Sequence, residues 1–418
     1  MKKIILAGVL ALVIINAHAQ AVSDTVSLGA AYANQVWYSL ANDEQGTAPK
    51  NNWDLAFEAT GLGATILTNS VSGVVLWNYP HADTSGWVSI DTTGIAGWQA
   101  RYNSDTSWEL GAMGRYANPT NPSDLDWGVY NVTTHAVTGD SVYIIKLGDG
   151  SYRKLRILSL VGAAYSFRYA NLDGTDQHDV LFSKAGYTRK NFGYYSLRTH
   201  TALDREPASA AWDLVFGQYT AFVPGPYTVT GALTNKGVVA AKCINVAAPS
   251  SYTDWSSGAF TSAINTIGYN WKTFNGVSYD AVDSTVYFVK TAGGDIWKLI
   301  FTGFGGSANG NCMFSKEQLY TQTSVPATIG GPVSSLAIYP NPATGAGAHI
   351  VYSLLNAAAD AHITLHDLTG RLVYAAQLAG GAGIGQHIIP SGLLTAGVYT
   401  VTLTDTETTL QTKLIVQQ

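Results

Sequence analysis

The sequence predicts an all-β protein made of two tandem, mostly antiparallel β modules and a C-terminal Ig-like β-sandwich. Short runs of β-branched and aromatic residues recur between glycine turns, which is typical of strands. No segment shows the sustained 3.6-residue period of a long helix. Several strand-like runs occur twice in the same order, which indicates a repeated module. With 418 residues, the chain is long enough for roughly two or three domains.

The N-terminal segment predicts export. Residues 1–19 start with two lysines, continue as an apolar run and end in Ala17-His18-Ala19, which fits a small-x-small cleavage site. This length and these flanks are typical of a signal peptide and too short for a membrane span, although a buried N-terminal strand or helix is the alternative. No other stretch approaches 18 apolar residues, so we predict no transmembrane segment.

Composition limits the partners and cofactors. Charged residues make up 12% of the chain, against a typical ~25%, which favours an exported protein with a polar, uncharged surface. The net charge is −5 and no Lys/Arg cluster occurs, so nucleic acid is not an expected partner. The two cysteines, Cys243 and Cys312, are candidates for one disulfide in an oxidising compartment, with two free buried thiols as the alternative. They cannot form a four-cysteine zinc site, and we predict no metal site.

The internal repeat is most visible in two motifs. WDLAFE at 53–58 returns as WDLVFG at 212–217, and VYIIK at 142–146 returns as VYFVK at 286–290. The two pairs have different offsets, so the first copy carries an insertion before Trp127. Each VYIIK-like run is followed by a glycine turn and a further strand-like run, which predicts a hairpin.

The repeat sets the predicted module boundaries. We place the first module at 22–186 and the second at 187–322. Asp54 and Asp213 occupy equivalent places in the WDL motif. Equivalent positions in tandem modules are expected to lie far apart, so these carboxylates are not a catalytic pair. We expect each to bond a neighbouring backbone or loop N–H.

The end of the chain differs in composition. Residues 323–335 are rich in Ser, Thr, Gly and Pro and predict a linker. Residues 336–418 carry seven or so short strand-like runs, which predicts the Ig-like β-sandwich. The motifs YPNPA, DLTGRLV, LLTAGVYTVTL and KLIV occur there in order and resemble the type A C-terminal sorting domain of Bacteroidetes type IX secretion cargo. The resemblance implies export through the periplasm, handling by the type IX machinery, and release outside the cell or attachment to the outer-membrane surface. A generic Ig-like module is the alternative.

The repeated module resembles the HmuY family of haem-binding proteins. The resemblance rests on Trp37-Tyr38, WDLAF, Trp127-x-x-Tyr130, VYIIK, a Gly-Asp-Gly turn, RKLRI and YSFRY, and the second copy matches it less fully. It implies a mostly antiparallel β structure that grips haem between sheet edges and loops. In the founding members, two histidines ligate the iron, and methionine is the usual substitute for such a ligand.

The haem-ligand pattern is broken in this sequence. The family's second ligand is expected near Val132, and the nearest histidine is His135. The first ligand is expected in the insertion before Trp127, where Met113 is the only candidate. Met113 and His135 are therefore the candidate axial ligands of a haem cofactor, with a buried Met and a loop His as the alternative. In the second copy, the only candidate is Met313.

Other chemistry is less well supported. The motifs G-x-S-x-G and H-E-x-x-H are absent, so we predict that the protein is not an enzyme. Oxygen ligands alternate between Asn171 and Asp179, but a closing Glu is missing, which favours a polar turn over a calcium loop. Aromatic side chains can stack on flat ligands, and four tryptophans of the insertion have no partner in the second copy. These ligand-contact candidates are Trp77, Trp87, Trp98 and Trp108.

Together these patterns predict a secreted or surface-attached, non-catalytic binding protein. The family resemblance makes haem or another porphyrin the expected ligand. The alternative is a surface adhesin or glycan-binding protein that uses exposed aromatics of the insertion. A purely structural surface protein is the third reading.

Overall fold

A computed structural model describes residues 20–61, 63–322, 333–344, 347–354, 361–378, 383–405 and 409–417. Strands dominate these residues, and their only α-helix is the single turn α1 (Gly306–Asn309), so the predicted all-β class is confirmed. None of the helices in the described residues is long and apolar enough to cross a membrane. The predicted signal peptide and residues 323–332 of the predicted linker lie outside the described residues, whereas Val333–Ser335 already belong to a strand.

The first seven-stranded sheet is antiparallel. Its order is β6-β9-β10-β11-β12, and β8 and then β7 continue from β10 on the side of β9. Its strands are β6 (Val75–Asn78), β7 (Gly128–Asn131), β8 (Ala136–Gly139), β9 (Tyr143–Lys146), β10 (Tyr152–Val161), β11 (Ala164–Asn171) and β12 (His178–Ser183). Aromatic and polar residues alternate in the YSFRY motif, and β11 accordingly buries Tyr165, Phe167 and Tyr169 on one face.

The second seven-stranded sheet has the same order. It runs β17-β20-β21-β22-β1, and β19 and then β18 continue from β21. The place of β12 is taken here by β1, which comes from the start of the chain. The strands are β1 (Val22–Ser27), β17 (Val239–Cys243), β18 (Lys272–Phe274), β19 (Tyr279–Ala281), β20 (Val286–Lys290), β21 (Ile296–Phe304) and β22 (Asn311–Tyr320).

Two four-stranded sheets lie between the larger ones, and each contains a hairpin from the other predicted module. In one sheet, of order β16-β15-β2-β3, the early hairpin pairs with late strands. In the other, of order β14-β13-β4-β5, the reverse holds. The strands are β2 (Asn34–Ser39), β3 (Asp43–Pro49), β4 (Leu55–Glu58), β5 (Ile66–Thr68), β13 (Phe192–Ser196), β14 (Thr201–Leu203), β15 (Leu214–Phe222) and β16 (Pro226–Thr234).

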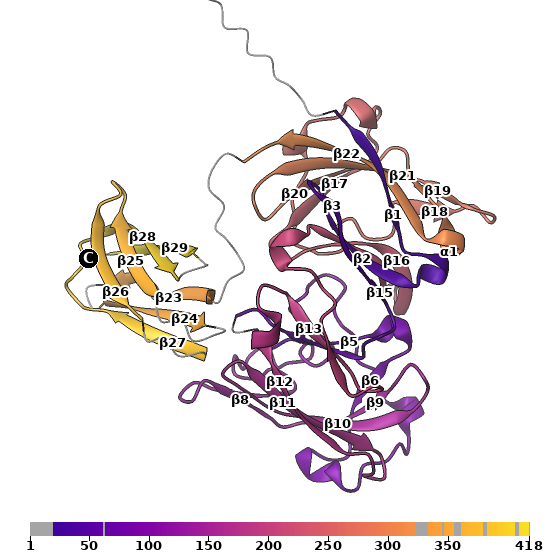
Figure 1. Ribbon diagram of the computed structural model, residues 1–418, viewed down its shortest axis with the longest axis horizontal. Coiled ribbons are helices and arrows are strands. Elements are labelled where there is room, and N and C mark those ends of the chain that lie inside the picture. Colours follow the sequence, from indigo (N-terminus) through magenta and orange to yellow (C-terminus); the bar gives the residue numbers. More distant parts are fainter. Residues whose placement is uncertain are drawn as a thin grey trace, which may run out of the picture.

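The sheets and cores therefore divide the chain differently from the predicted modules. The first body, β4 to β14, is continuous, and its core runs from Leu55 to Leu197. The second body joins β1–β3 to β15–β22, and its core combines residues between Val26 and Leu40 with residues between Leu214 and Phe314. Figure 1 shows the indigo strands β1 to β3 among the orange strands of the second body. The ranges 22–186 and 187–322 stay predictions about repeated sequence units.

Short 3₁₀ helices join the strands of both bodies. They are η1 (Ala30–Tyr32), η2 (Ser70–Ser72), η3 (Thr84–Trp87), η4 (Ile95–Gly97), η5 (Lys184–Tyr187), η6 (Ser209–Ala211), η7 (Pro249–Ser251) and η8 (Trp255–Ser257).

The predicted disulfide is wrong. Cys243 lies in β17 and Cys312 in β22, and β20 and β21 separate these strands in the sheet. Neighbouring strands lie ~4.8 Å apart, so three spacings put the two residues at least roughly 14 Å apart. A disulfide requires Cα atoms within about 7 Å. Both cysteines are free thiols, and burial raises the pKa of Cys312 to about 12.

The C-terminal domain contains seven described strands around its own core. The sheet order is β26-β25-β28-β29-β23-β24-β27. Strand β23 pairs with β24 and then, through Ala343, runs parallel to Val416 of β29, so the predicted sandwich is more closely a mixed half-barrel. The strands are β23 (Val333–Thr344), β24 (Gly347–Leu354), β25 (His362–Asp367), β26 (Leu372–Gln377), β27 (Gly383–Ile389), β28 (Gly397–Thr404) and β29 (Thr409–Val416).

Candidate functional site

The WDL aspartates hold the hairpins that line the space between the two bodies. Asp54 accepts the Leu197 N–H at 2.8 Å, and Asp213 accepts the Leu40 N–H at 2.8 Å. Each leucine directly follows the first strand of a hairpin, β13 or β2. The expectation that these carboxylates bond a neighbouring loop is confirmed. Asp54 also accepts a hydrogen bond from the Arg198 Nε at 3.0 Å, whereas burial raises the pKa of Asp213.

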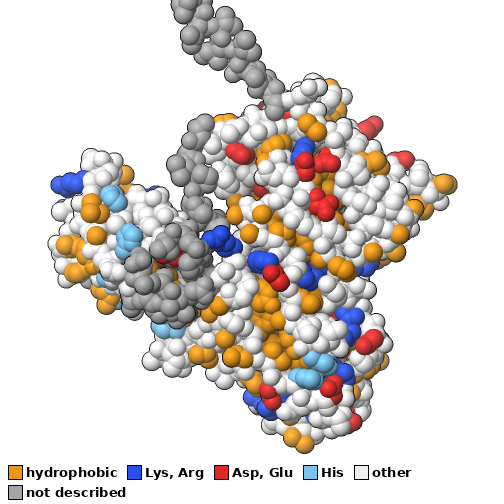
Figure 2. All heavy atoms as spheres, viewed as in Figure 1, with side chains coloured by type: hydrophobic (Ala, Val, Ile, Leu, Met, Phe, Trp, Pro, Cys, Tyr) orange, Lys and Arg blue, Asp and Glu red, His pale blue; other side chains and the backbone are white. Residues whose placement is uncertain are grey.

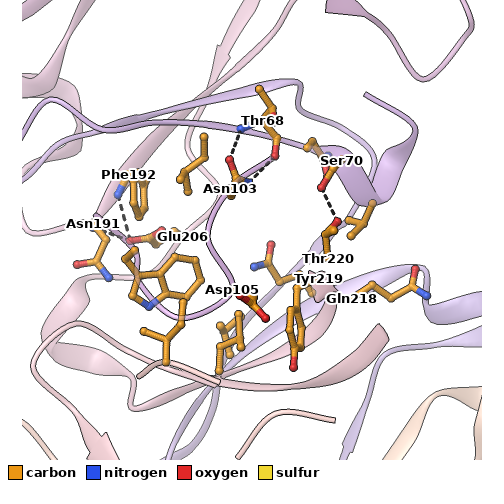
Figure 3. Close-up of a pocket in the computed structure, with 18 of the residues that line it drawn as sticks. Thr68, Ser70, Asn103, Asp105, Asn191, Phe192, Glu206, Gln218, Tyr219 and Thr220 are labelled. Atoms are coloured by element: carbon orange, nitrogen blue, oxygen red, sulfur yellow. Dashed lines mark hydrogen bonds between the residues drawn. The ribbon is translucent and has the colours of Figure 1, made fainter. Parts of the chain in front are cut away.

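A cavity of about 100 Å³ lies between the bodies (Figure 3). Aromatic side chains from both bodies form its apolar walls, and amide, hydroxyl and carboxylate groups complete the lining. The two bodies are joined across it by the hydrogen bond between the Ser70 and Thr220 hydroxyls at 2.8 Å. The aromatic wall consists of Trp37, Trp53, Trp108, Phe192, Tyr194, Trp212 and Tyr219. This space suits a small polar ligand, because pockets for drug-sized ligands measure roughly 300–1,000 Å³.

Glu206 is the buried acid of this cavity. Its carboxylate accepts the Asn191 N–H at 2.5 Å, the Phe192 N–H at 3.3 Å and the Tyr194 hydroxyl at 2.8 Å. Burial raises the pKa of Glu206 to about 7, and these hydrogen bonds oppose the rise. The neighbouring Arg205 lies over the Tyr194 ring at 4.9 Å. Because the Glu206 carboxylate already accepts these hydrogen bonds, its role is to position the surrounding residues of the cavity wall.

The four insertion tryptophans do not form one surface. Trp108 lines the cavity, donates from Nε1 to the Thr234 carbonyl at 2.7 Å, and packs against apolar clusters from both bodies. Trp77, Trp87 and Trp98 pack instead in a separate cluster of the first body. All four side chains are half-buried, so the exposed aromatic surface expected from the insertion is not formed by them.

The structure does not bring the two haem-ligand candidates to one surface. Met113 has no exposed surface and belongs to the buried core cluster of the first body. His135 is exposed in the turn between β7 and β8, with φ at 54°. Its Nδ1 lies 2.7 Å from the Tyr130 hydroxyl, which leaves Nε2 as the nitrogen able to bind iron. His135 therefore fits one axial ligand, and Met113 does not fit the second in this packing.

Comparison with family models identifies two parts of the chain. Residues 31–169 match the model described as HmuY protein. The chain contains an HmuY domain. Residues 337–417 match the secretion system C-terminal sorting domain, so the protein is secreted to the cell surface or outside the cell. No curated protein and no solved structure matches the chain.

The HmuY match does not follow the packed bodies. It covers β2 and β3 of the second body and β4 to β10 and most of β11 of the first. It stops before β12 and the hairpin β13–β14, which complete the sheets of the first body. The second copy has no match of its own to the HmuY model, so the tandem HmuY arrangement stays a prediction.

One group of residues was missed by sequence reasoning. Asp176, His178 and His200 place their ligand atoms within 4.8 Å of one another, just beyond the HmuY match. The Asp-x-His spacing is visible in the sequence, and in the structure Asp176 lies in the turn directly before β12, which His178 begins. His200 lies in the turn of the hairpin β13–β14, and only the sheet arrangement brings it to that face.

Proposed function

We propose that the protein is an exported, non-catalytic binding protein that captures haem or a related porphyrin at the cell surface. The observation that carries this proposal is the match of residues 31–169 to the HmuY family, a haem-binding family. The sorting domain supports the location, because such a domain indicates secretion to the cell surface or outside the cell.

His135 supplies the residue-level hypothesis. The Tyr130 hydroxyl orients the imidazole through Nδ1, and such outer partners fix the ring of a metal-bound histidine. We assign His135 as the iron ligand on one face of the haem. Ligation by Met113 on the other face requires the insertion to open, since the thioether is packed in the core.

The proposal includes duplication of the module. Both seven-stranded sheets have the same strand order, and both WDL aspartates bond the N–H that follows the first strand of a hairpin. These correspondences support two copies of one ancestral unit. We propose haem binding for the first copy, which holds His135.

A haem titration of the purified protein tests the function. We expect a Soret shift that saturates at one haem per chain. In His135→Ala we expect the affinity for haem to fall at least tenfold. Met113→Leu keeps the apolar packing, so unchanged affinity would assign binding to the His135 face alone. The control is His81→Ala, another exposed histidine of the same body. Absence of a Soret shift in the wild-type protein would refute haem capture.

Glycan binding is the second candidate function, and the central cavity favours it. Trp108 and Trp212 line it together with the amide of Gln218, a combination that suits stacking and hydrogen bonding to a sugar unit. A glycan array checks this candidate. Trp108→Ala should abolish any signal, whereas Trp87→Ala and Trp98→Ala should not. The reverse pattern would move the site to the insertion cluster.

A further inference from the structure

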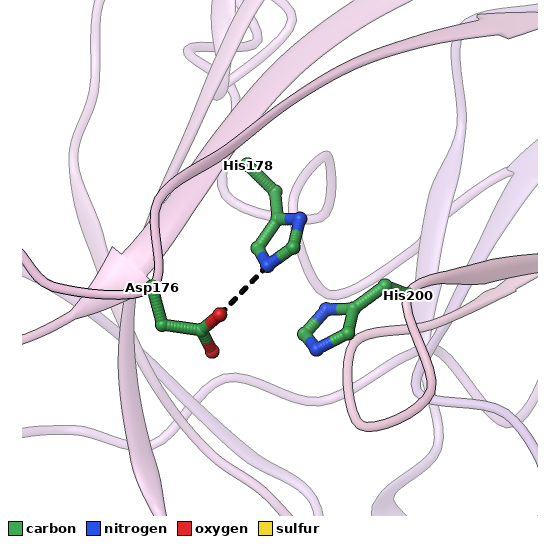
Figure 4. A group of neighbouring side chains, drawn as sticks. All are labelled: Asp176, His178 and His200. Carbon is green, nitrogen blue, oxygen red and sulfur yellow. Dashed lines mark hydrogen bonds and ion pairs between the residues drawn. The ribbon is translucent and has the colours of Figure 1, made fainter.

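Three ligand-type side chains converge at one edge of the first body. Asp176 lies in the turn before β12, His178 is the first residue of β12, and His200 lies in the turn of the hairpin β13–β14. Figure 4 shows them facing one another from two separate elements. Asp176 and His200 are exposed and His178 is half-buried. Histidine side chains (pale blue) reach the surface of the lower body in Figure 2.

The spacing of the three groups is that of ligands on one ion. Asp176 Oδ1 lies 2.9 Å from His178 Nε2, and all three residues offer atoms within 4.8 Å of one another. Zinc binds imidazole nitrogen and carboxylate oxygen at ~2.0–2.2 Å, so two ligands of one ion lie about 3 Å apart. Small side-chain rotations are therefore enough to close the site.

Tyr169 holds the imidazoles in place. This buried tyrosine places its hydroxyl 2.7 Å from His200 Nδ1, which leaves the Nε2 of His200 as the nitrogen able to bind an ion. Its ring also stacks on His178 with a centroid distance of 5.0 Å. A metal-bound histidine almost always has such a partner on its other nitrogen. The partner is built into the core of the sheet, so the site is preorganised.

Arg153 lies beside the second oxygen of the carboxylate. Its Nη2 is 3.4 Å from Asp176 Oδ2, so Oδ1 remains directed at His178. Two neutral imidazoles and one carboxylate give the cluster the two-nitrogen, one-oxygen donor set of an open three-ligand site.

We propose that Asp176, His178 and His200 bind a divalent transition-metal ion such as Zn²⁺, with the fourth position open to water. Imidazole nitrogen favours zinc, copper and nickel over calcium, which prefers oxygen ligands. The polar turn weighed for calcium contributes Asp176 to this site. Its Asp173 instead accepts the Thr175 hydroxyl at 2.7 Å, as in an ordinary polar turn.

The site is distinct from a haem site. The His178 and His200 rings are stacked with centroids 3.9 Å apart and an interplanar angle of 14°. Axial ligands must instead approach a haem from opposite faces, and this stack leaves no room for a porphyrin. The metal site lies near Leu155 of β10, because Leu155 is opposite Tyr169 and Tyr169 is opposite His178. His135 lies near Leu160 of the same strand, which is opposite Val137. Five residues along β10 separate the two places by roughly 17 Å.

Titration of the full-length, tag-free protein with Zn²⁺, after treatment with a chelator, tests the proposal. We expect one zinc per chain by calorimetry and a higher thermal midpoint in its presence, since an ion that binds only the folded state stabilises it. His178→Ala and His200→Asn should each weaken binding at least tenfold. Asparagine is chosen because residue 200 has a positive φ, which Asn tolerates.

Two controls make the outcome decisive. His135→Ala should leave zinc affinity unchanged, and equal melting curves with chelator present show that the variants fold. Cu²⁺ in place of Zn²⁺ should give an electron paramagnetic resonance signal with nitrogen coupling that His178→Ala changes. Absence of zinc binding, or affinity unchanged in both folded variants, would overturn the proposal. The haem titration is independent, because His178→Ala should leave the Soret shift intact.

Discussion

The two bodies place different chemistry at the same turn of their hairpins. Ser39 ends β2 and Ser196 ends β13, and the fourth residue after each serine has a left-handed backbone. In the second body this residue is Asp43, with φ at 63°, and in the first it is His200, with φ at 55°. The turn geometry is shared, so the side chain alone sets what the place can do.

The partners of these residues differ in the same way. Tyr169 lies opposite Leu155, and Lys316 lies opposite the matching Leu299. Lys316 pairs with Asp43 in the second body, whereas Tyr169 bonds His200 in the first. In the second body the two opposite charges compensate each other, so this position is not open to a ligand. In the first body the imidazole of His200 is held by the phenol of Tyr169 and keeps a free lone pair. A binding site can therefore arise at this turn in the first body and not in the second.

Removing β1–β3 is the largest test of the division into bodies. A chain without residues 20–49 loses an edge strand, a hairpin and core residues such as Tyr38 from the second body. We expect complete loss of cooperative unfolding in that body and a retained transition in the first, measured by calorimetry with limited proteolysis. Removal of 333–418 is the control and should leave both transitions. Two intact transitions without β1–β3 would break the comparison.

The WDL aspartates give a smaller, graded effect. Asp54→Ala removes a fully buried carboxylate that bonds both the Leu197 N–H and Arg198, so we expect a loss of about 3–5 kcal/mol in unfolding free energy. Asp213→Ala removes the bond to the Leu40 N–H and should cost about 1–2 kcal/mol. Urea unfolding measures both. Asn at either site keeps an acceptor and serves as the control, and equal losses at the two sites would contradict the difference.

The smallest effect is expected at Asp43. The Asp43 side chain is 67% exposed, whereas Lys316 is buried and also donates to the Leu40 carbonyl. Asparagine keeps an oxygen that can accept from Lys316, so Asp43→Asn should cost ~0.2–1 kcal/mol at pH 7. The hydrogen bond from Lys316 lowers the pKa of Asp43. Its contribution is therefore present above the ordinary carboxyl pKa and is lost as the pH falls through the lowered value. Urea unfolding at pH 7 and pH 2.5 checks this, and a loss above 2 kcal/mol would reject a surface role.

Local patterns predicted the local structure. Runs of β-branched and aromatic residues predicted strands such as β9, and the short Asp side chains of the WDL motif predicted bonds to a loop. The division into bodies could not be predicted in this way. Matching hairpins carry matching sequence signals, so the pattern does not reveal which copy of β4 or β15 a hairpin joins. Cys243 and Cys312 show the same limit, because their separation depends on strand order.

The candidate sites show which contacts between segments a sequence pattern can predict. Asp176 and His178 are close in sequence, whereas His200 needs the pairing of β13 with β4 to reach them. The half-burial of Trp87 and Trp98 likewise depends on packing against the first sheet. A family resemblance located the HmuY domain, but it did not place Met113 in the core.

The second body can complete its sheets only after the whole of the continuous first body has been synthesised. Strands β1 to β3 are synthesised first, yet their partners β15 and β22 follow only after the whole of β4 to β14. Pairings this distant in sequence form slowly. The first body can assemble early, while β1 and the free β2 edge of the β2–β3 hairpin still lack their partners and stay open to wrong ones. In this exported protein, the strand edges that stay unpaired longest during folding are therefore those near the N-terminus. A shortened chain that joins β3 directly to β15 would remove that delay.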